Sequence, residues 1–151
     1  MTAFTIPKGW FLVATGFVLL LASQTAFSDT IEVRFYGFRS SEGFIAFNVF
    51  EAEKSDSFPD KSTEAVKSYY LPLDGKTEIV QTIEIASGDY AISAMHDEDG
   101  DRKFRTGLFG IPREGYGFSK DAKVYFGPPS FDRAKFNTQG ISKIDIKIRY
   151  F

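Results

Sequence analysis

The chain has 151 residues, a formal net charge of −2 at neutral pH and no cysteine, which is the length of one domain. The lack of cysteine excludes a disulfide framework, a thiol nucleophile and a lipid-modified cysteine anchor. The mildly acidic balance argues against nucleic acid or an anionic membrane as a partner, because both bind basic surfaces.

Residues 1–28 have the order of a secretory signal peptide. Lys8 is followed by a run of twelve uncharged residues, FLVATGFVLLLA at 11–22, and then by small and polar residues. This succession of a positive region, an apolar region and a cleavage site is typical of exported proteins. Cleavage after Ser28 would place small residues at both required positions, and cleavage after Ala26 is the alternative.

Export predicts a mature chain at 29–151, folded as a single domain in the periplasm or the medium. Removing 28 of the 151 residues leaves 123, and the loss of Lys8 moves the net charge from −2 to −3. A run of twelve residues is short for a membrane span, which needs about 20. We therefore expect no transmembrane span after signal removal, and an uncleaved anchor is the less favoured alternative.

After the signal, apolar residues recur with a period of two, which indicates strands. Residues 31–38 alternate apolar and polar side chains, and residues 44–50 are apolar on both faces at all but one position, as in a central strand. Residues 51–66 are polar and form a long connection, with a short helical turn predicted at 60–66.

A hairpin is predicted around Asp74-Gly75, between strands at 68–73 and 77–85. This dipeptide favours a type I′ turn, which needs positive φ at both central residues. Three isoleucines of the second strand are predicted to share one face: Ile79, Ile83 and Ile85.

Further strands are predicted at 90–96, at 123–126 inside a long irregular stretch, and at 141–150, where apolar and charged residues alternate. Short strands separated by turn signals indicate an all-β protein. We expect an antiparallel Greek-key β-sandwich of about seven strands.

The sequence HDEDGDRKF, at 96–104, places three aspartates at alternate positions around a glycine. Calcium takes six to eight oxygen ligands, which alternate residues of a tight loop can supply. In this register the predicted ligands are the side chains of Asp97, Asp99 and Asp101 and the carbonyl of Lys103.

The loop departs from the helix–loop–helix calcium pattern, because Arg102 stands where glycine is needed and Leu108 stands where a bidentate carboxylate is needed. One interpretation is a looser calcium site completed by Glu98, Glu114 or loop carbonyls. The other is a turn in which aspartates accept hydrogen bonds from backbone N–H groups and Gly100 supplies positive φ. The sequence leaves both open.

His96 is the only histidine and a candidate ligand-binding residue. A single histidine excludes zinc sites built on two or three of them, and no nucleophile-elbow motif is present. We therefore expect no enzymatic activity. A small enzyme using carboxylates and His96 is the least favoured alternative.

Residues 116–131 interleave large aromatic side chains with glycine and proline. One interpretation is a carbohydrate-binding surface. The other is a loop whose aromatics plug the end of the core, because exposing them all would give a monomer an unusual apolar patch. The candidate ligand-binding residues of this region are Glu114, Tyr116, Phe118 and Tyr125.

Four stretches together resemble a bacterial family of exported proteins, domain-of-unknown-function family 2141. They are GDYAISAMHDEDGD at 88–101, FGIPREGYGFS at 109–119, GPPSFDRAKF at 127–136 and IKIRY at 146–150. The likeness covers essentially the whole mature chain. It implies a small envelope or secreted β-sandwich, transthyretin-like or immunoglobulin-like, and no established activity.

In that family the loop usually reads His-Asp-Glu-Asn-Gly-Asn-Gly-Lys. This chain has Asp99 and Asp101 where asparagine is common, which adds charge, and Arg102 where glycine is usual. We expect a binding or structural module of the cell envelope, with an envelope or extracellular component as its partner. A carbohydrate-binding module is the alternative.

Overall fold

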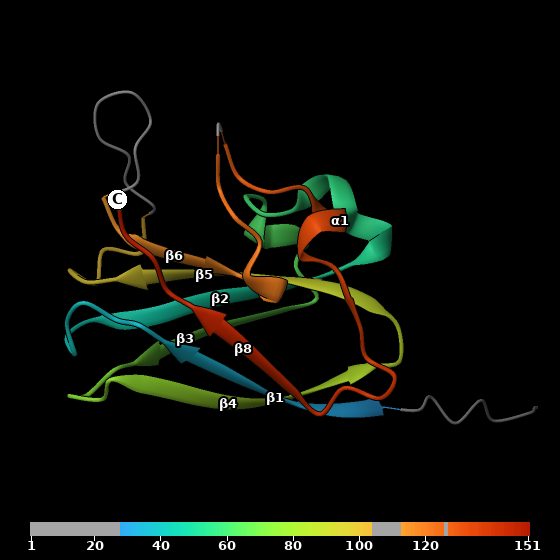
Figure 1. The fold of residues 1–151 in the computed structure, drawn as a ribbon, viewed down its shortest axis with the longest axis horizontal. Coiled ribbons are helices and arrows are strands. Elements are labelled where there is room, and N and C mark those ends of the chain that lie inside the picture. The colour runs from blue at the N-terminus through green and yellow to red at the C-terminus, as the bar shows by residue number, and fades with distance from the viewer. Residues whose placement is uncertain (1–27, 104–112, 126) are drawn as a thin grey trace, which may run out of the picture.

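Two β-sheets pack face to face in the computed structural model, which describes residues 28–103, 113–125 and 127–151 (Figure 1). One sheet has the strand order β4-β1-β8, and the other has the order β3-β2-β5-β6, with β7 paired to β5. The strands are β1 (Ser28–Tyr36), β2 (Phe44–Glu51), β3 (Lys67–Pro72), β4 (Glu78–Ala86), β5 (Asp89–Asp97), β6 (Gly115–Phe118), β7 (Phe136–Asn137) and β8 (Lys143–Lys147). The predicted all-β sandwich is confirmed.

The period of two explains how the sheets meet. Ile31, Val33 and Phe35 of β1 are fully buried, whereas the residues between them are partly exposed. The centre of the Phe35 ring lies 4.6 Å from that of Phe47 on β2, with the ring planes tilted by 42°, so the two sheets touch through aromatic side chains. The three isoleucines of β4 share the inner face, as predicted: Ile79, Ile83 and Ile85.

The predicted hairpin at Asp74-Gly75 is wrong, although its turn has the predicted conformation. The φ angles are +50° at Asp74 and +80° at Gly75. However, β3 pairs with β2, whereas β4 pairs with β1 along its whole length. Turn chemistry sets the backbone of two residues, but it does not decide whether the flanking strands pair, and here the chain passes from one sheet to the other.

Two further expectations need correction. The sandwich is not purely antiparallel, because β8 runs parallel to β1. Residues 123–125 form no strand, and Phe126 lies outside the described residues. The strand of this region is β6, whose four residues are all buried and therefore show no alternation.

Short helical segments cover one end of the sandwich (Figure 1). They are η1 (Ala52–Ser57), η2 (Ser62–Glu64), η4 (Ser119–Asp121) and α1 (Phe131–Ala134). The segment η2 lies inside the helical turn predicted at 60–66, and α1 was not predicted. No helix in the described part of the chain is long and apolar enough to cross a membrane. The predicted signal peptide lies outside the described residues, apart from Ser28.

Candidate metal site at the end of strand β5

Asp97, the last residue of β5, holds the aspartate-rich loop together. It is fully buried, and its carboxylate accepts three hydrogen bonds. They come from the backbone N–H groups of Gly100 and Arg102, both at 2.9 Å, and from the hydroxyl of Tyr70 on β3 at 2.7 Å. Burial, followed by this bond to the carboxylate, raises the pKa of Tyr70, so its phenol remains a donor.

The loop beyond Asp97 continues as two further side-chain turns. Asp99 accepts a hydrogen bond from the backbone N–H of Asp101 at 3.2 Å, and Asp101 accepts one from the N–H of Lys103 at 2.9 Å. Gly100 has a φ of +75°. The interpretation as an Asp-stabilised turn with glycine at positive φ is therefore confirmed.

The same turn brings carboxylates together. One carboxylate oxygen from each of Asp97, Asp99, Asp101 and Glu114 lies within 4.8 Å of the others. Two ligands of one calcium ion can be separated by at most two Ca–O distances, or about 4.6–5.2 Å. The cluster could therefore hold a metal ion.

Strand register explains why Glu114 belongs to this cluster. His96 of β5 pairs with Gly115 of β6, so Glu114 falls opposite Asp97 at the next step of the ladder. Glu114 is only 6% exposed. The acids of the turn thus meet an acid that is more than a dozen residues away in sequence, and the two inner carboxylates, those of Asp97 and Glu114, come from neighbouring strand ends.

Glu98, the other acid expected to complete the site, lies elsewhere. Its carboxylate binds the guanidinium of Arg39, with Nε at 3.0 and 3.1 Å, and accepts a hydrogen bond from the hydroxyl of Ser40 at 3.2 Å. Arg39 also donates to the carbonyl of Arg113. Glu98 therefore joins the loop to the segment before β6 instead of facing the cluster. The ligand role of the Lys103 carbonyl stays a prediction.

Replacing Glu98 by glutamine is expected to lower the free energy of unfolding more at neutral pH than at acid pH. The hydrogen bond from Arg39 holds the pKa of Glu98 below its ordinary value of 4.5. The carboxylate therefore stabilises the fold fully above that value, and this contribution is lost as pH falls through the lowered pKa. Urea unfolding at about pH 7 and pH 3.5 should show that the difference in free energy of unfolding between wild type and Glu98→Gln is smaller at acid pH. A deficit independent of pH would contradict this assignment.

Arg102 adopts the left-handed backbone conformation, with φ at +62°. Its guanidinium carbon lies 4.5 Å from the centre of the Tyr70 ring, a cation–π contact that offsets part of the strain.

Arg102→Ala is expected to destabilise the protein by about 0.5–1 kcal/mol, because it removes that contact and keeps the strain. Arg102→Gly should be more stable than Arg102→Ala by about 1 kcal/mol, because glycine tolerates this φ. Denaturant unfolding of both variants tests the pair, and an alanine variant at least as stable as the glycine variant would show that φ carries no cost here.

His96 lies inside the fold. It is fully buried, its Nε2 lies 2.8 Å from the carbonyl of Glu42 and its Nδ1 lies 2.6 Å from the hydroxyl of Tyr150. The carbonyl requires a donor, so Nε2 carries the proton and Nδ1 accepts from Tyr150. With both ring nitrogens engaged, this placement gives no support to a ligand-binding role or to an enzyme using His96.

The aromatics of the 116–131 region mostly plug the core. Tyr116, Phe118 and Phe131 are buried in a second apolar cluster with Phe50 and Phe58. The exception among the candidate ligand-binding residues is Tyr125, which is 68% exposed. A carbohydrate-binding platform made of Tyr116 and Phe118 is therefore not available on this surface.

Sequence reasoning missed Tyr70, Arg39 and Tyr150 as partners of the loop. Each comes from a different segment, and nothing in its local sequence points to β5.

Together, the two sheets and the acidic cluster define a β-sandwich domain with a candidate metal site at one end. The chain belongs to the family described as uncharacterized protein conserved in bacteria (DUF2141), whose profile matches residues 33–145. Membership of this family, expected from the four stretches, is thus confirmed, and the matched range includes the four acids of the cluster. Searches of curated proteins and of solved structures found no match.

Proposed function

We propose that this protein is an exported binding module of the bacterial cell envelope, and that calcium bound to its aspartate-rich loop stabilises the surface it presents to a partner. The observation that carries the proposal is the approach of four carboxylates, from Asp97, Asp99, Asp101 and Glu114, within 4.8 Å. Its role is contact with an envelope or extracellular component rather than catalysis.

The donor set favours calcium over softer metals. All four side chains offer oxygen, and the single histidine is engaged with Glu42 and Tyr150. Magnesium demands near-ideal octahedral geometry at 2.0–2.1 Å, whereas calcium accepts irregular sets of oxygens at 2.3–2.6 Å. An ion held between the loop and Glu114 would also join two segments of the chain.

Calorimetric titration with calcium tests the proposal, with one variant inside the cluster and a matched variant beside it. Glu114→Gln removes a charged ligand and should weaken calcium binding about tenfold or more. Glu98→Gln removes the same charge from a residue bound to Arg39 and should leave the affinity within about threefold of wild type. Absence of binding at millimolar calcium, or equal losses in the two variants, would refute the calcium site.

Export is supported by the order of charged, apolar and small residues in the first 28 positions. Expression of the full chain in a bacterium, followed by N-terminal sequencing of the product, tests it. The expected new terminus follows Ser28 or Ala26. A product that retains residues 11–22 would overturn the signal-peptide assignment.

A further inference from the structure

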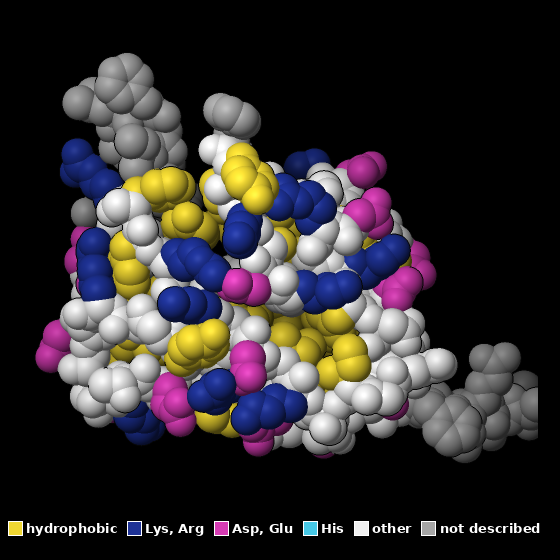
Figure 2. All heavy atoms as spheres, in the orientation of Figure 1, with side chains coloured by type: hydrophobic (Ala, Val, Ile, Leu, Met, Phe, Trp, Pro, Cys, Tyr) yellow, Lys and Arg dark blue, Asp and Glu magenta, His cyan; other side chains and the backbone are white. Residues whose placement is uncertain are grey.

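The net charge of the whole chain conceals an uneven distribution. Residues 28–103 carry 16 acidic and 8 basic side chains, whereas residues 113–151 carry 4 acidic and 8 basic ones. Figure 2 shows Lys and Arg side chains spread across the face that carries β8 in Figure 1. Many cations of an acidic protein thus gather on the face that carries β8 (Figure 2).

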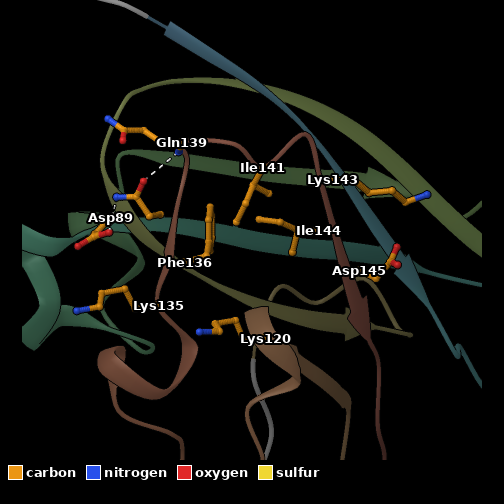
Figure 3. A pocket seen from close by; sticks show the side chains of 10 residues that line it. Asp89, Lys120, Lys135, Phe136, Gln139, Ile141, Lys143, Ile144 and Asp145 are labelled. Carbon is orange, nitrogen blue, oxygen red and sulfur yellow. Dashed lines mark hydrogen bonds between the residues drawn. The ribbon is translucent and has the colours of Figure 1, made fainter.

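A hollow of about 530 Å³ lies on this face, between β8 and the segments around η4 and β7. Its lining combines cations with a small apolar floor. In Figure 3, Lys135 and Lys143 lie toward opposite ends of the hollow, and Lys120 stands between them along one side. The apolar side chains between these lysines are Phe136, Ile141 and Ile144.

Two acids near the hollow are already paired with arginine. Asp145 accepts a hydrogen bond from Arg34 Nε at 2.7 Å, and Asp121 binds the guanidinium of Arg149. Asp89, at one end of the hollow, accepts a hydrogen bond from the Asn137 amide at 2.8 Å. The arginines therefore offset much of the negative charge around the hollow.

The lysines of the hollow are not held in strong ion pairs within the described part of the chain. Lys143 lies 3.4 Å from Glu32 and Lys135 lies 3.3 Å from Asp132, and both pairs are solvent-exposed. Exposed pairs of this kind contribute little and exchange readily for another anion. Lys120 makes no ion pair with any residue in the described part of the chain.

We propose that this hollow binds an extended carbohydrate chain carrying anionic groups. Carboxylate or phosphate groups spaced along the chain would meet the lysines at the two ends and one side of the hollow, and the sugar rings would span the distance between them. This names the class of partner for the binding module proposed above, and it does not depend on calcium.

The lining of the hollow favours an anionic carbohydrate over a lipid or a nucleic acid as the partner. Phe136 is 4% exposed and Ile144 is 8% exposed, so little apolar area is available for an acyl chain. The same burial leaves no aromatic face in the lining for stacking a nucleobase, on which single-stranded nucleic acid binding depends. The side-chain amide of Gln139 lines the hollow and suits sugar hydroxyls.

The test is a calorimetric titration of the purified protein with a galacturonate oligosaccharide, at low salt, beside a neutral maltooligosaccharide of the same length. Lys120→Glu with Lys143→Glu should weaken binding of the anionic oligosaccharide about tenfold or more. Lys61→Glu with Lys76→Glu is the matched control, since both lysines are exposed and lie outside the hollow. It makes the same change in net charge and should alter affinity by no more than about threefold.

Three results would overturn this site. The Lys61→Glu, Lys76→Glu variant could weaken binding as much as the Lys120→Glu, Lys143→Glu variant. The neutral oligosaccharide could bind as tightly as the anionic one, or the anionic oligosaccharide could fail to bind. Binding to anionic lipid vesicles without binding to the oligosaccharide would likewise replace the carbohydrate with a membrane. Calcium titration of the hollow variants separates the two proposals, because their calcium affinity should match that of wild type.

Discussion

Replacing Asp97 by alanine is expected to lower the free energy of unfolding by about 3–5 kcal/mol. The carboxylate is fully buried and accepts bonds from Gly100, Arg102 and Tyr70. Alanine would leave these donors without their acceptor, and a hydrogen bond to a charged group contributes about 1.5–3 kcal/mol. Urea unfolding in the presence of a chelator measures this loss apart from any effect of metal.

Asp99→Ala is the matched control for this prediction. Asp99 is exposed, and its hydrogen bond from the N–H of Asp101, at 3.2 Å, lies within its own turn. Its loss should cost less than about 1 kcal/mol in chelator. Equal effects of the two variants would show that Asp97 does not organise the loop.

Gly43→Ala is expected to be at least as damaging, at about 4 kcal/mol or more, because it combines two penalties. Gly43 has a φ of +75°, and a Cβ there would overlap the carbonyl oxygen of Asp97 and stand 2.7 Å from the Cα of Glu98. Both obstacles are backbone atoms, so no side-chain rotation relieves them. The substitution should displace the loop from the start of β2.

Gly75→Ala separates the two penalties. Gly75 has nearly the same φ, +80°, but no atom lies within 4 Å of an added Cβ. It should lose only the conformational term, about 1 kcal/mol. Thermal and urea unfolding of the two variants test the difference, and equal losses would mean that the backbone approach at Gly43 is not required.

These variants probe one feature, the contact between the segment before β2 and the end of β5. Gly43 lets the backbone pass against Asp97, and the neighbouring Glu42 carbonyl accepts the hydrogen bond from His96. The loop that carries the acids is thus fixed on one side by backbone packing and on the other by Tyr70. This preorganisation is what a cation site on a turn requires.

The strands were largely predictable because burial of one face imposes a period of two, as in β1 and β4. Pairing was not predictable to the same degree. Asp74-Gly75 has the backbone of a hairpin turn but joins two sheets, because β4 pairs with β1 and not with β3. The strand β6 was not predicted, because all of its residues are buried and its sequence therefore shows no alternation of apolar and polar side chains.

The residues of the site that are close in sequence were predictable. Those that strand register brings together were less predictable. Asp97, Asp99 and Asp101 follow from spacing alone, whereas the choice between Glu98 and Glu114 depends on how β5 pairs with β6. The net charge of the whole chain argued against anionic partners. It hides the difference between residues 28–103, which carry an excess of acidic side chains, and residues 113–151, which carry an excess of basic ones.

The most direct test of the metal site is the melting temperature of the purified protein in chelator and across a calcium titration, with magnesium as the control. Calcium at about 100 times its dissociation constant should add roughly 2.7 kcal/mol, or several degrees. We expect a calcium-specific rise that is abolished by Asp99→Ala with Asp101→Ala. An unchanged melting temperature at millimolar calcium would contradict the account and leave the loop as a turn alone.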